Sequence, residues 1–232
     1  MKNSIPISVV IPVFNEENTL LELNKRLEKT LKNYEYELIY VNDGSTDKSA
    51  EILKILCSKD SRIKLVSSNN NTGKYFAYTA GLTMANKELI TMIDSDLQVN
   101  PEDIKCLVSK LSEGYDVVVG WRKNRKDSLL RVRLPSLAYN FLLKILFKTK
   151  IHDAVCPLKV FKSDCLKNVN LKRGDHRLLI PILKTKGCNI TEVEINHNPR
   201  RYGKSKFTLL GRVYETIWPL IRLLFKKYWS LK

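Results

Sequence analysis

Short apolar runs rich in β-branched residues alternate with stretches of helical periodicity through the first 120 residues of the chain. Repeated strand and helix units of this kind build a mainly parallel sheet with helices packed on its faces. The expected strands cover residues 7–13, 37–41, 63–66, 89–93 and 116–120. The expected helices lie between them, at residues 17–32, 46–58, 73–86 and 101–112. The alternation therefore predicts an α/β fold.

Polar and acidic residues follow four of the expected strands, in the segments 12–16, 42–47, 69–74 and 94–98. Ligands of open α/β sheets bind at the carboxyl ends of the strands, so these segments are expected to line one site. The chain has no G-x-G-x-x-G after its first strand and no G-x-x-x-x-G-K-[ST] motif. The sequence therefore gives little reason to predict a Rossmann dinucleotide site or a P-loop. The sequence predicts a different nucleotide pocket, with carboxylates at its edge.

Asp94 and Asp96 stand two residues apart just after an expected buried strand, where extended geometry would project both side chains to the same side. Two such oxygen ligands can hold Mg²⁺ or Mn²⁺ and bridge it to a diphosphate. A D-x-D sequence is also typical of a turn that caps the next helix. Two neighbours favour the metal site. Asp43 ends another strand, where it can accept a hydrogen bond from a base or ribose, and Lys74 begins a helix whose N-terminus favours phosphate.

Four segments in this order resemble the inverting glycosyltransferases of family 2, which have the GT-A fold. They are V-I-P-V-F-N-E-E at 10–17, V-N-D-G-S-T-D at 41–47, N-x-G-K at 71–74 and D-S-D-L-Q at 94–98. Five later segments are similar to the dolichol-phosphate mannose synthase-like branch, which moves a sugar onto a polyprenyl phosphate. They are G-W-R-K-N-R-K-D at 120–127, L-P-S at 134–136, D-A-V-C-P-L-K-V-F at 153–161, H-R-L-L-I-P at 176–181 and H-N-P-R-R-Y-G-K-S-K at 197–206.

The resemblance implies a Rossmann-like GT-A sheet and a site for a nucleotide-diphosphate sugar, UDP- or GDP-linked. The residues implied in binding this donor are Pro12, Val13, Asn15, Glu16, Asp43, Lys74, Asp94, Ser95, Asp96 and Gln98. Those implied as ligands of Mg²⁺ or Mn²⁺ are Asp94, Asp96 and Gln98. The expected catalytic residues are Asp94, Asp96 and Arg122.

A phosphate acceptor favours cationic side chains rather than a general base. A sugar hydroxyl must lose a proton to attack, whereas a phosphate monoester is already ionised at neutral pH. It needs positive groups that bind and orient it. Arg122, Arg131, Arg133, Arg200 and Lys206 are of the right type. Together with the other residues of the segments that resemble the polyprenyl-phosphate branch, the expected acceptor-phosphate site comprises Arg122, Arg131, Arg133, Asp153, Lys159, His176, Arg177, Arg200, Ser205 and Lys206. The chain departs from the family pattern at Lys159, where many relatives have Arg.

The net charge of +16 is concentrated in two segments, 121–150 and 199–232, each with nine basic side chains and one acidic side chain. Both segments also contain wide apolar stripes, at 134–147 and 217–229. Basic helices with such stripes are typical of a lipid headgroup interface. No run reaches the ~18 apolar residues of a membrane span, and the residues before the first strand lack the pattern of a signal peptide, so we expect none. We expect a peripheral protein on the cytoplasmic side of an anionic membrane, where a membrane protein or a second copy could also bind.

The leading hypothesis is therefore an inverting hexosyltransferase that places a sugar on a polyprenyl phosphate for cell-envelope glycan or lipid modification. One alternative keeps the fold but gives it a saccharide hydroxyl acceptor, as in polysaccharide or lipopolysaccharide assembly. Another is a nucleic-acid-binding module, which the acidic sheet edge disfavours. The expected catalytic domain covers residues 1–210, with a nucleotide half (1–120) and an acceptor half (121–210). Residues 211–232 would form a basic amphipathic tail at the membrane.

Overall fold

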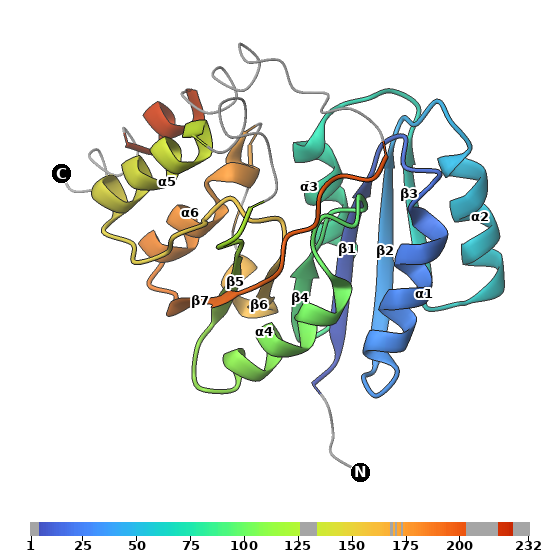
Figure 1. Ribbon diagram of the computed structural model, residues 1–232, viewed down its shortest axis with the longest axis horizontal. Coiled ribbons are helices and arrows are strands. Elements are labelled where there is room, and N and C mark those ends of the chain that lie inside the picture. Colours follow the sequence, from blue (N-terminus) through green and yellow to red (C-terminus); the bar gives the residue numbers. More distant parts are fainter. Residues whose placement is uncertain are drawn as a thin grey trace.

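The computed structural model describes residues 5–125, 134–167, 169, 171–172, 174–202 and 218–224. Within these residues the strands form a seven-stranded sheet in the order β3-β2-β1-β4-β6-β5-β7 (Figure 1). The strands are β1 (Ile7–Val13), β2 (Tyr36–Asp43), β3 (Ile63–Ser68), β4 (Leu89–Met92), β5 (Val117–Trp121), β6 (Lys159–Lys162) and β7 (Ile190–Glu194). Only β6 among these strands runs antiparallel to its neighbours, β4 and β5. The sheet is mostly parallel, as expected.

Helices cover both faces of the sheet (Figure 1). They are α1 (Leu20–Leu31), α2 (Ser49–Lys59), α3 (Lys74–Met84), α4 (Ile104–Leu111), α5 (Leu134–Phe147) and α6 (Leu179–Thr185), with the short helices η1 (Pro101–Asp103), η3 (Ser163–Leu166) and η4 (Asp175–Arg177). Residues 218–224 form a further short helix. The core lies between these layers, and β1 and β2 are buried along their whole length.

The close approach of α3 to the sheet depends on a glycine. A Cβ atom at Gly81 would lie 2.3 Å from Cγ1 of Val10 and 3.2 Å from Cγ2 of Val41. Any larger residue would therefore push α3 away from β1 and β2. Because α3 begins at the edge where the acidic segments meet, this packing also sets the position of its first residue, Lys74.

The first two helices begin later than the sequence predicts, at Leu20 and Ser49 rather than at about residues 17 and 46. Hydrogen bonds between the two preceding loops explain the delay. The side-chain oxygen of Asn15 accepts from the backbone N–H of Thr46 at 2.7 Å, and that of Glu17 accepts from the N–H of Lys48 at 3.0 Å. Because these loop residues are hydrogen-bonded to each other, they are not part of the helices, and each helix begins a few residues later.

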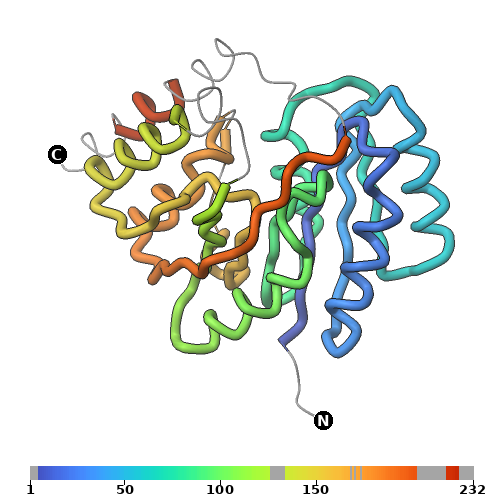
Figure 2. Tube along the Cα trace, viewed as in Figure 1, coloured from blue at the N-terminus to red at the C-terminus, as the bar shows by residue number. Residues whose placement is uncertain are grey.

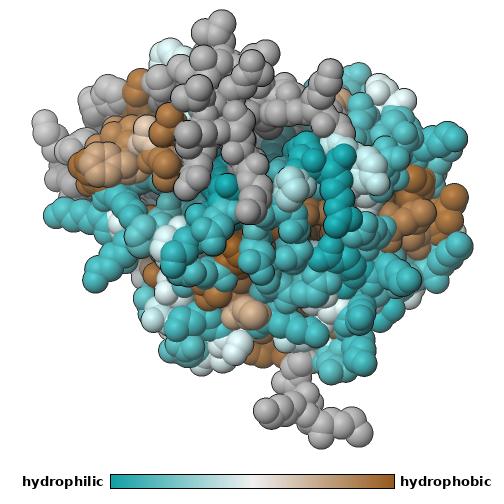
Figure 3. Space-filling model, in the orientation of Figure 1, coloured by the Kyte–Doolittle hydropathy of each residue, from teal (hydrophilic) through white to brown (hydrophobic). Residues whose placement is uncertain are grey.

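Helix α5 turns its predicted apolar stripe outward. Its buried side chains are Tyr139, Asn140, Leu143 and Phe147. The exposed large apolar side chains there are Leu134, Leu137, Phe141, Leu142 and Ile145, and Trp218 and Ile221 are exposed on helix 218–224. Figure 3 shows apolar surface gathered over α5. None of the helices in the described ranges is both long and apolar enough to cross a bilayer.

Candidate active site

Asp96 lies in a turn that starts directly after Asp94, not in the extended geometry expected from the sequence. Strand β4 ends at Met92, and Leu97 has a positive φ of 56°. The turn forms because a carboxylate oxygen of Asp96 accepts the backbone N–H of Gln98 at 3.1 Å. The hydroxyl of Ser95 donates to the carbonyl oxygen of Pro12 at 2.9 Å, which ties the turn to the end of β1. The extended expectation was wrong, but the turn still holds both carboxylates at the carboxyl edge of the sheet.

The carboxylate of Asp94 is held by two side chains of α3. Nζ of Lys74 lies 2.5 Å from one oxygen, and the hydroxyl of Tyr78 donates to the other at 3.0 Å. Burial acts to raise the pKa of Asp94, but the Lys74 ammonium and these hydrogen bonds outweigh it and lower the pKa below its usual value. Asp94 is therefore a firmly ionised carboxylate. The sequence analysis did not single out Tyr78.

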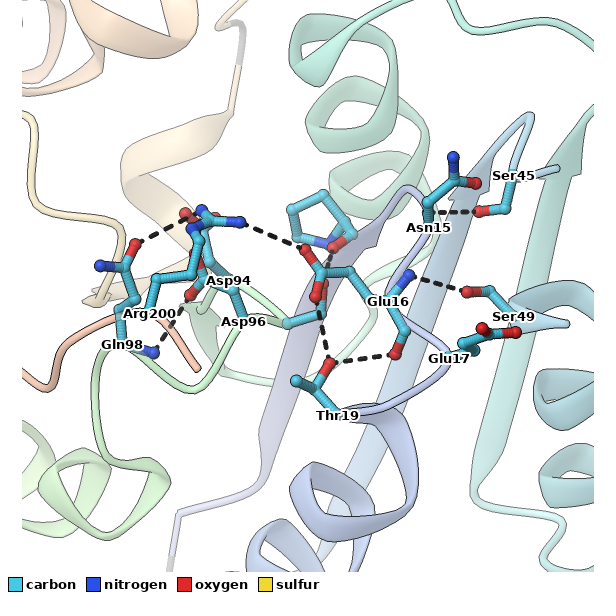
Figure 4. Close-up of polar contacts among 12 residues, drawn as sticks. Asn15, Glu16, Glu17, Thr19, Ser45, Ser49, Asp94, Asp96, Gln98 and Arg200 are labelled. Atoms are coloured by element: carbon cyan, nitrogen blue, oxygen red, sulfur yellow. Dashed lines mark hydrogen bonds and ion pairs between the residues drawn. The ribbon is translucent and has the colours of Figure 1, made fainter. Parts of the chain in front are cut away.

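Asp96 faces a different partner, Arg200 (Figure 4). Nη2 of Arg200 lies 2.6 Å from a carboxylate oxygen of Asp96 and 3.4 Å from the side-chain oxygen of Gln98. Nη1 of Arg200 lies 3.8 Å from Glu16. Burial, and after it the negative charge of Asp94, raise the pKa of Asp96, although Arg200 acts in the opposite direction. The surroundings thus disfavour the ionised form of Asp96, and an additional cation beside it would stabilise that form.

Arg200 reaches this position on a segment that returns across the sheet after β7. Figures 1 and 2 show the segment in orange and red, crossing the sheet toward the ends of β1 and β2. His197 forms a β-bridge with Val99, and the backbone N–H of Asn198 donates to the carbonyl oxygen of Gln98 at 2.8 Å. The side chain of Asn198 donates to Asn100 at 2.8 Å. These contacts fix the segment beside the Asp94–Asp96 turn. Arg200 and Asp96 are thus in contact although 104 positions separate them in the sequence.

Asp43 holds a loop of the protein itself. Its two carboxylate oxygens accept the backbone N–H groups of Thr72 and Gly73, each at 2.8 Å, just before α3. Gly44 has a positive φ of 69°, and a Cβ atom there would lie 2.5 Å from the carbonyl carbon of Asn70. Asp43 and Gly44 together place the start of α3, and hence Lys74, at the site.

The ends of β1 and β2 are joined by backbone N–H groups that donate to serine hydroxyls. The N–H of Asn15 donates to Ser45 at 3.0 Å, and that of Glu16 donates to Ser49 at 2.9 Å (Figure 4). Val13 is buried at the end of β1. The residues expected to contact the nucleoside therefore lie together on one edge, next to the Asp94–Asp96 turn.

In the expected acceptor half, Arg122 and Asp153 form a buried ion pair. Nε of Arg122 donates to one oxygen of Asp153 at 2.7 Å, and Nη2 donates to the other at 3.1 Å. Burial acts to raise the pKa of Asp153, but the Arg122 guanidinium outweighs it and holds this pKa below its usual value. Both partners are removed from water, so the pair positions the start of the acceptor half. As a general base, Asp153 is weakened by its low pKa.

Lys159 lies near carboxylates from both expected halves of the chain. It opens β6, is buried, and donates from Nζ to the carbonyl oxygen of Cys156. Burial lowers the pKa of Lys159 to about 8, although the negative charges of Asp153 and Asp94 act to raise it. Lys159 therefore lies within electrostatic reach of a carboxylate from each half.

His176 and Arg177 lie on η4, next to α3 and α5. The rings of His176 and Tyr78 have centroids 6.2 Å apart. Burial, reinforced by the charge of Arg177, lowers the pKa of His176 to about 3. His176 is therefore neutral at physiological pH, while Arg177 acts electrostatically on Tyr139 of α5.

Two polar residues near the acceptor half were missed by the sequence analysis. Nη1 of Arg125 donates to the hydroxyl of Ser136 at the start of α5, at 2.8 Å. Both stand in segments that the resemblance had marked, 120–127 and 134–136, and that location was the available signal. Four expected acceptor residues lie outside the described part of the chain: Arg131, Arg133, Ser205 and Lys206.

The donor set at the turn fits a divalent ion that is shared with a diphosphate. Within the described residues, no group of three or more His, Cys, Asp or Glu side chains could hold a metal by itself. Mg²⁺ and similar ions are usually bound through one or two carboxylates together with substrate phosphates. Asp96 lies beside Asp94 at the same turn, and the two carboxylates match such a site. The side-chain oxygen of Gln98 lies at the same turn and contacts Arg200.

Comparison with known proteins agrees with this geometry. The family model described as "Glycosyl transferase family 2" matches residues 8–169, more than half of the chain. The protein belongs to glycosyl transferase family 2. Its residues 94–98 thus lie inside the family-2 region, whereas Arg200 lies beyond the matched residues.

The names of two curated relatives of this family-2 protein both contain a polyprenyl phosphate. A dodecaprenyl-phosphate galacturonate synthase from Rhizobium johnstonii is 34% identical over 228 residues, which cover 96% of this chain and 67% of that protein. An undecaprenyl-phosphate 4-deoxy-4-formamido-L-arabinose transferase from Proteus mirabilis is 37% identical over 208 residues, covering 88% of this chain and 63% of that protein. The chain thus spans about two thirds of the length of these relatives.

The fold is shared with a solved structure of glucosyl-3-phosphoglycerate synthase from Mycobacterium tuberculosis. That protein, solved with Mn²⁺, UDP-glucose and phosphoglyceric acid, superposes with a TM-score of 0.68 at 22% identity, over 93% of this chain and 77% of its own. The likeness confirms the expected GT-A fold of the family-2 protein.

Proposed function

We propose that this protein transfers a sugar from a nucleotide-diphosphate sugar to a polyprenyl phosphate, with inversion at the anomeric carbon. An oxygen of the acceptor phosphate would form the new bond to C1 while the bond from C1 to the donor diphosphate breaks. The nucleoside diphosphate then leaves. A single displacement of this kind inverts the configuration at C1. The names of the two curated relatives, which differ in sugar but share a polyprenyl phosphate, support the acceptor class.

The donor would bind at the edge formed by the ends of β1, β2 and β4. We assign its nucleoside to the neighbourhood of Pro12, Val13, Asn15, Glu16 and Asp43. Asp94, Asp96 and Gln98 would hold Mg²⁺ or Mn²⁺ with the diphosphate, and the Mn²⁺ and UDP-glucose in the mycobacterial structure support this assignment. A bound divalent ion would neutralise the charge that develops on the leaving diphosphate.

The observation that carries the proposal is the state of Asp153. A saccharide acceptor needs a base to remove its hydroxyl proton, and Asp153 is the carboxylate among the acceptor-site residues named from the sequence. Both of its oxygens accept hydrogen bonds from Arg122, and its pKa is held low. His176 is also a poor base, because its pKa lies at about 3. An acceptor that is already ionised needs neither group to remove a proton.

Cationic side chains of the acceptor half would bind the acceptor phosphate. Within the described residues we assign this role to Arg122, Lys159, Arg177 and Arg200, with Asp153 and His176 shaping the site. Arg131, Arg133, Ser205 and Lys206 remain part of the proposed set. The catalytic residues proposed are Asp94, Asp96 and Arg122.

The lipid part of the acceptor calls for a membrane surface, and α5 supplies a suitable face. Exposed apolar side chains of α5 and helix 218–224 lie next to a strongly basic segment. Such a face inserts into the headgroup region, while nearby lysines and arginines bind anionic lipids. We propose peripheral association with the cytoplasmic side of the membrane. The catalytic domain would cover residues 1–210, and residues 211–232 would add to the membrane contact.

A donor and acceptor screen tests the proposal. UDP- and GDP-sugars would be incubated with the protein, Mn²⁺ or Mg²⁺, and either a short-chain polyprenyl phosphate or a panel of saccharides. The proposal predicts a product with the mass of polyprenyl phosphate plus one sugar. Turnover with saccharides alone would replace it with the hydroxyl-acceptor alternative.

A further inference from the structure

One guanidinium group binds at the centre of the proposed donor site. Arg200 contacts Asp96 at 2.6 Å, Gln98 at 3.4 Å and Glu16 at 3.8 Å. All three partners belong to the set assigned to the donor and its metal ion. A guanidinium and a divalent cation both seek the same carboxylate oxygens, so they compete for Asp96.

The residues just before Arg200 are anchored, so its side chain can move while the backbone of the segment stays in place. His197 is buried and bridged to Val99, and Asn198 is hydrogen-bonded to Gln98 and Asn100. Arg200 stands two residues beyond Asn198, and its side chain is 31% exposed. The long, exposed side chain can therefore leave Asp96 by rotation about its own bonds while the segment stays bound.

We propose that Arg200 acts as an internal counter-ion for Asp96, and that a divalent ion arriving with the donor displaces it. The inference rests on the proposed function, because it concerns the same metal site. Arg200 would neutralise Asp96 while the donor site is empty, so that this buried carboxylate is not left without a compensating charge. Once displaced, its charge would be available to the acceptor phosphate, so that the donor and its ion favour binding of the acceptor.

Arg201 provides a matched control for this proposal. It is the adjacent residue of the same type, and its side chain is 58% exposed. Its Nη1 lies 3.5 Å from Glu22 on α1, away from the Asp94–Asp96 turn. Replacing either arginine with glutamine removes one positive charge, but only Arg200→Gln removes a competitor at Asp96.

The test measures binding of Mn²⁺ in the presence of UDP or GDP at the same concentration for every variant, as the further loss of the electron paramagnetic resonance signal of the free ion when protein is added. Arg200→Gln should bind Mn²⁺ about tenfold more tightly than wild type, the effect expected when a charge-assisted contact no longer competes. Arg201→Gln should bind as wild type does. Equal affinity of Arg200→Gln and wild type would overturn the proposal.

A second measurement follows Arg200 itself in the wild-type protein. An arginine-specific dicarbonyl reagent, with sites located by mass spectrometry, should modify Arg200 faster after Mn²⁺ is added, while Arg201 reacts at an unchanged rate. An unchanged rate at Arg200 would count against displacement.

Asp96→Asn separates this inference from the proposed function. If Asp96→Asn binds Mn²⁺ as wild type does, the metal assignment itself fails. If Asp96→Asn loses Mn²⁺ binding but Arg200→Gln matches wild type, the metal assignment stands and only the counter-ion role is wrong.

Discussion

Arg122 and Asp153 form a buried ion pair, and this pairing makes Asp153 a weak general base. Asp153 has a side chain only 5% exposed, and Arg122 only 10%. The bidentate contact uses two N–H groups of the guanidinium and both oxygens of the carboxylate. Such a pair contributes little net stability, but removing one partner leaves the other buried and uncompensated.

Arg122→Met should therefore destabilise the fold by about 3–5 kcal/mol, since it strands the Asp153 carboxylate. Urea unfolding would measure the change. The double variant Arg122→Met with Asp153→Leu serves as the control and should recover most of the loss, because no unpaired charge remains. If Arg122→Met unfolds at the same urea concentration as wild type, the pair does not hold this part of the structure.

The charge on Lys159 should make stability depend on pH. Burial lowers its pKa from 10.5 to about 8, so the unfolded chain binds more protons between these values and stability rises with pH across that window. The difference amounts to about 3 kcal/mol at 1.36 kcal/mol per pKa unit. Lys159→Met should thus be more stable than wild type by up to about 3 kcal/mol at pH 7.

Urea unfolding of both proteins at pH 7 and pH 9.5 measures this effect. The advantage of Lys159→Met should shrink at the higher pH, because the lysine is then largely neutral in the folded protein. A gap of equal size at both pH values would show that the charge of Lys159 is not responsible. The more stable variant should also lose activity, as expected where a buried charge serves function.

Several site residues could be predicted from sequence because the sheet edge alone places them. Asp43, Lys74 and Asp94 each follow a strand, and parallel strands end at the same edge. The partners of these side chains could not be predicted. Tyr78 donates a hydrogen bond to Asp94 because α3 packs closely on β1 and β2. That packing depends on Gly81. The contact between Arg200 and Asp96 depends on a chain reversal that no local pattern encodes.

At the scale of elements, the first 120 residues were predicted well because local periodicity decides them. The first strand begins and ends where expected, at Ile7 and Val13. Strand β6 shows the limit of that reasoning, since it is antiparallel and lies between β4 and β5 although it follows both in sequence. Periodicity identifies an apolar strand, but the neighbours of that strand are set by tertiary packing.

Helix α5 provides a prediction about membrane binding. Phe141 is 65% exposed on its outer face, so Phe141→Glu should weaken sedimentation with anionic vesicles by about tenfold, through loss of apolar insertion and repulsion by the lipid charge. Leu21 on α1 is 60% exposed and provides the matched control, Leu21→Glu.

Both glutamate variants should unfold at wild-type temperatures, because the replaced side chains are exposed. Equal loss of vesicle binding in the two variants would mean that net charge, and not the outer face of α5, controls association.

At the scale of the whole molecule, opposite charges are separated in sequence, and one described contact joins the two kinds of segment. The first 120 residues contain 17 acidic and 14 basic side chains, while the excess positive charge lies in 121–150 and 199–232. Arg200, in the second basic segment, lies 2.6 Å from Asp96 at the acidic edge. A cationic side chain therefore adjoins the carboxylates proposed to bind the metal and diphosphate, as the proposed transfer between two phosphorylated substrates requires.

The most direct test of this account compares two acceptors that differ only in the phosphate. Initial rates would be measured with the preferred donor and Mn²⁺, using a short-chain polyprenyl phosphate and the polyprenol of the same length. We predict transfer to the phosphate and a rate at least about a hundredfold lower with the alcohol, because neither Asp153 nor His176 is suited to remove the hydroxyl proton. Equal rates with the two acceptors would contradict it.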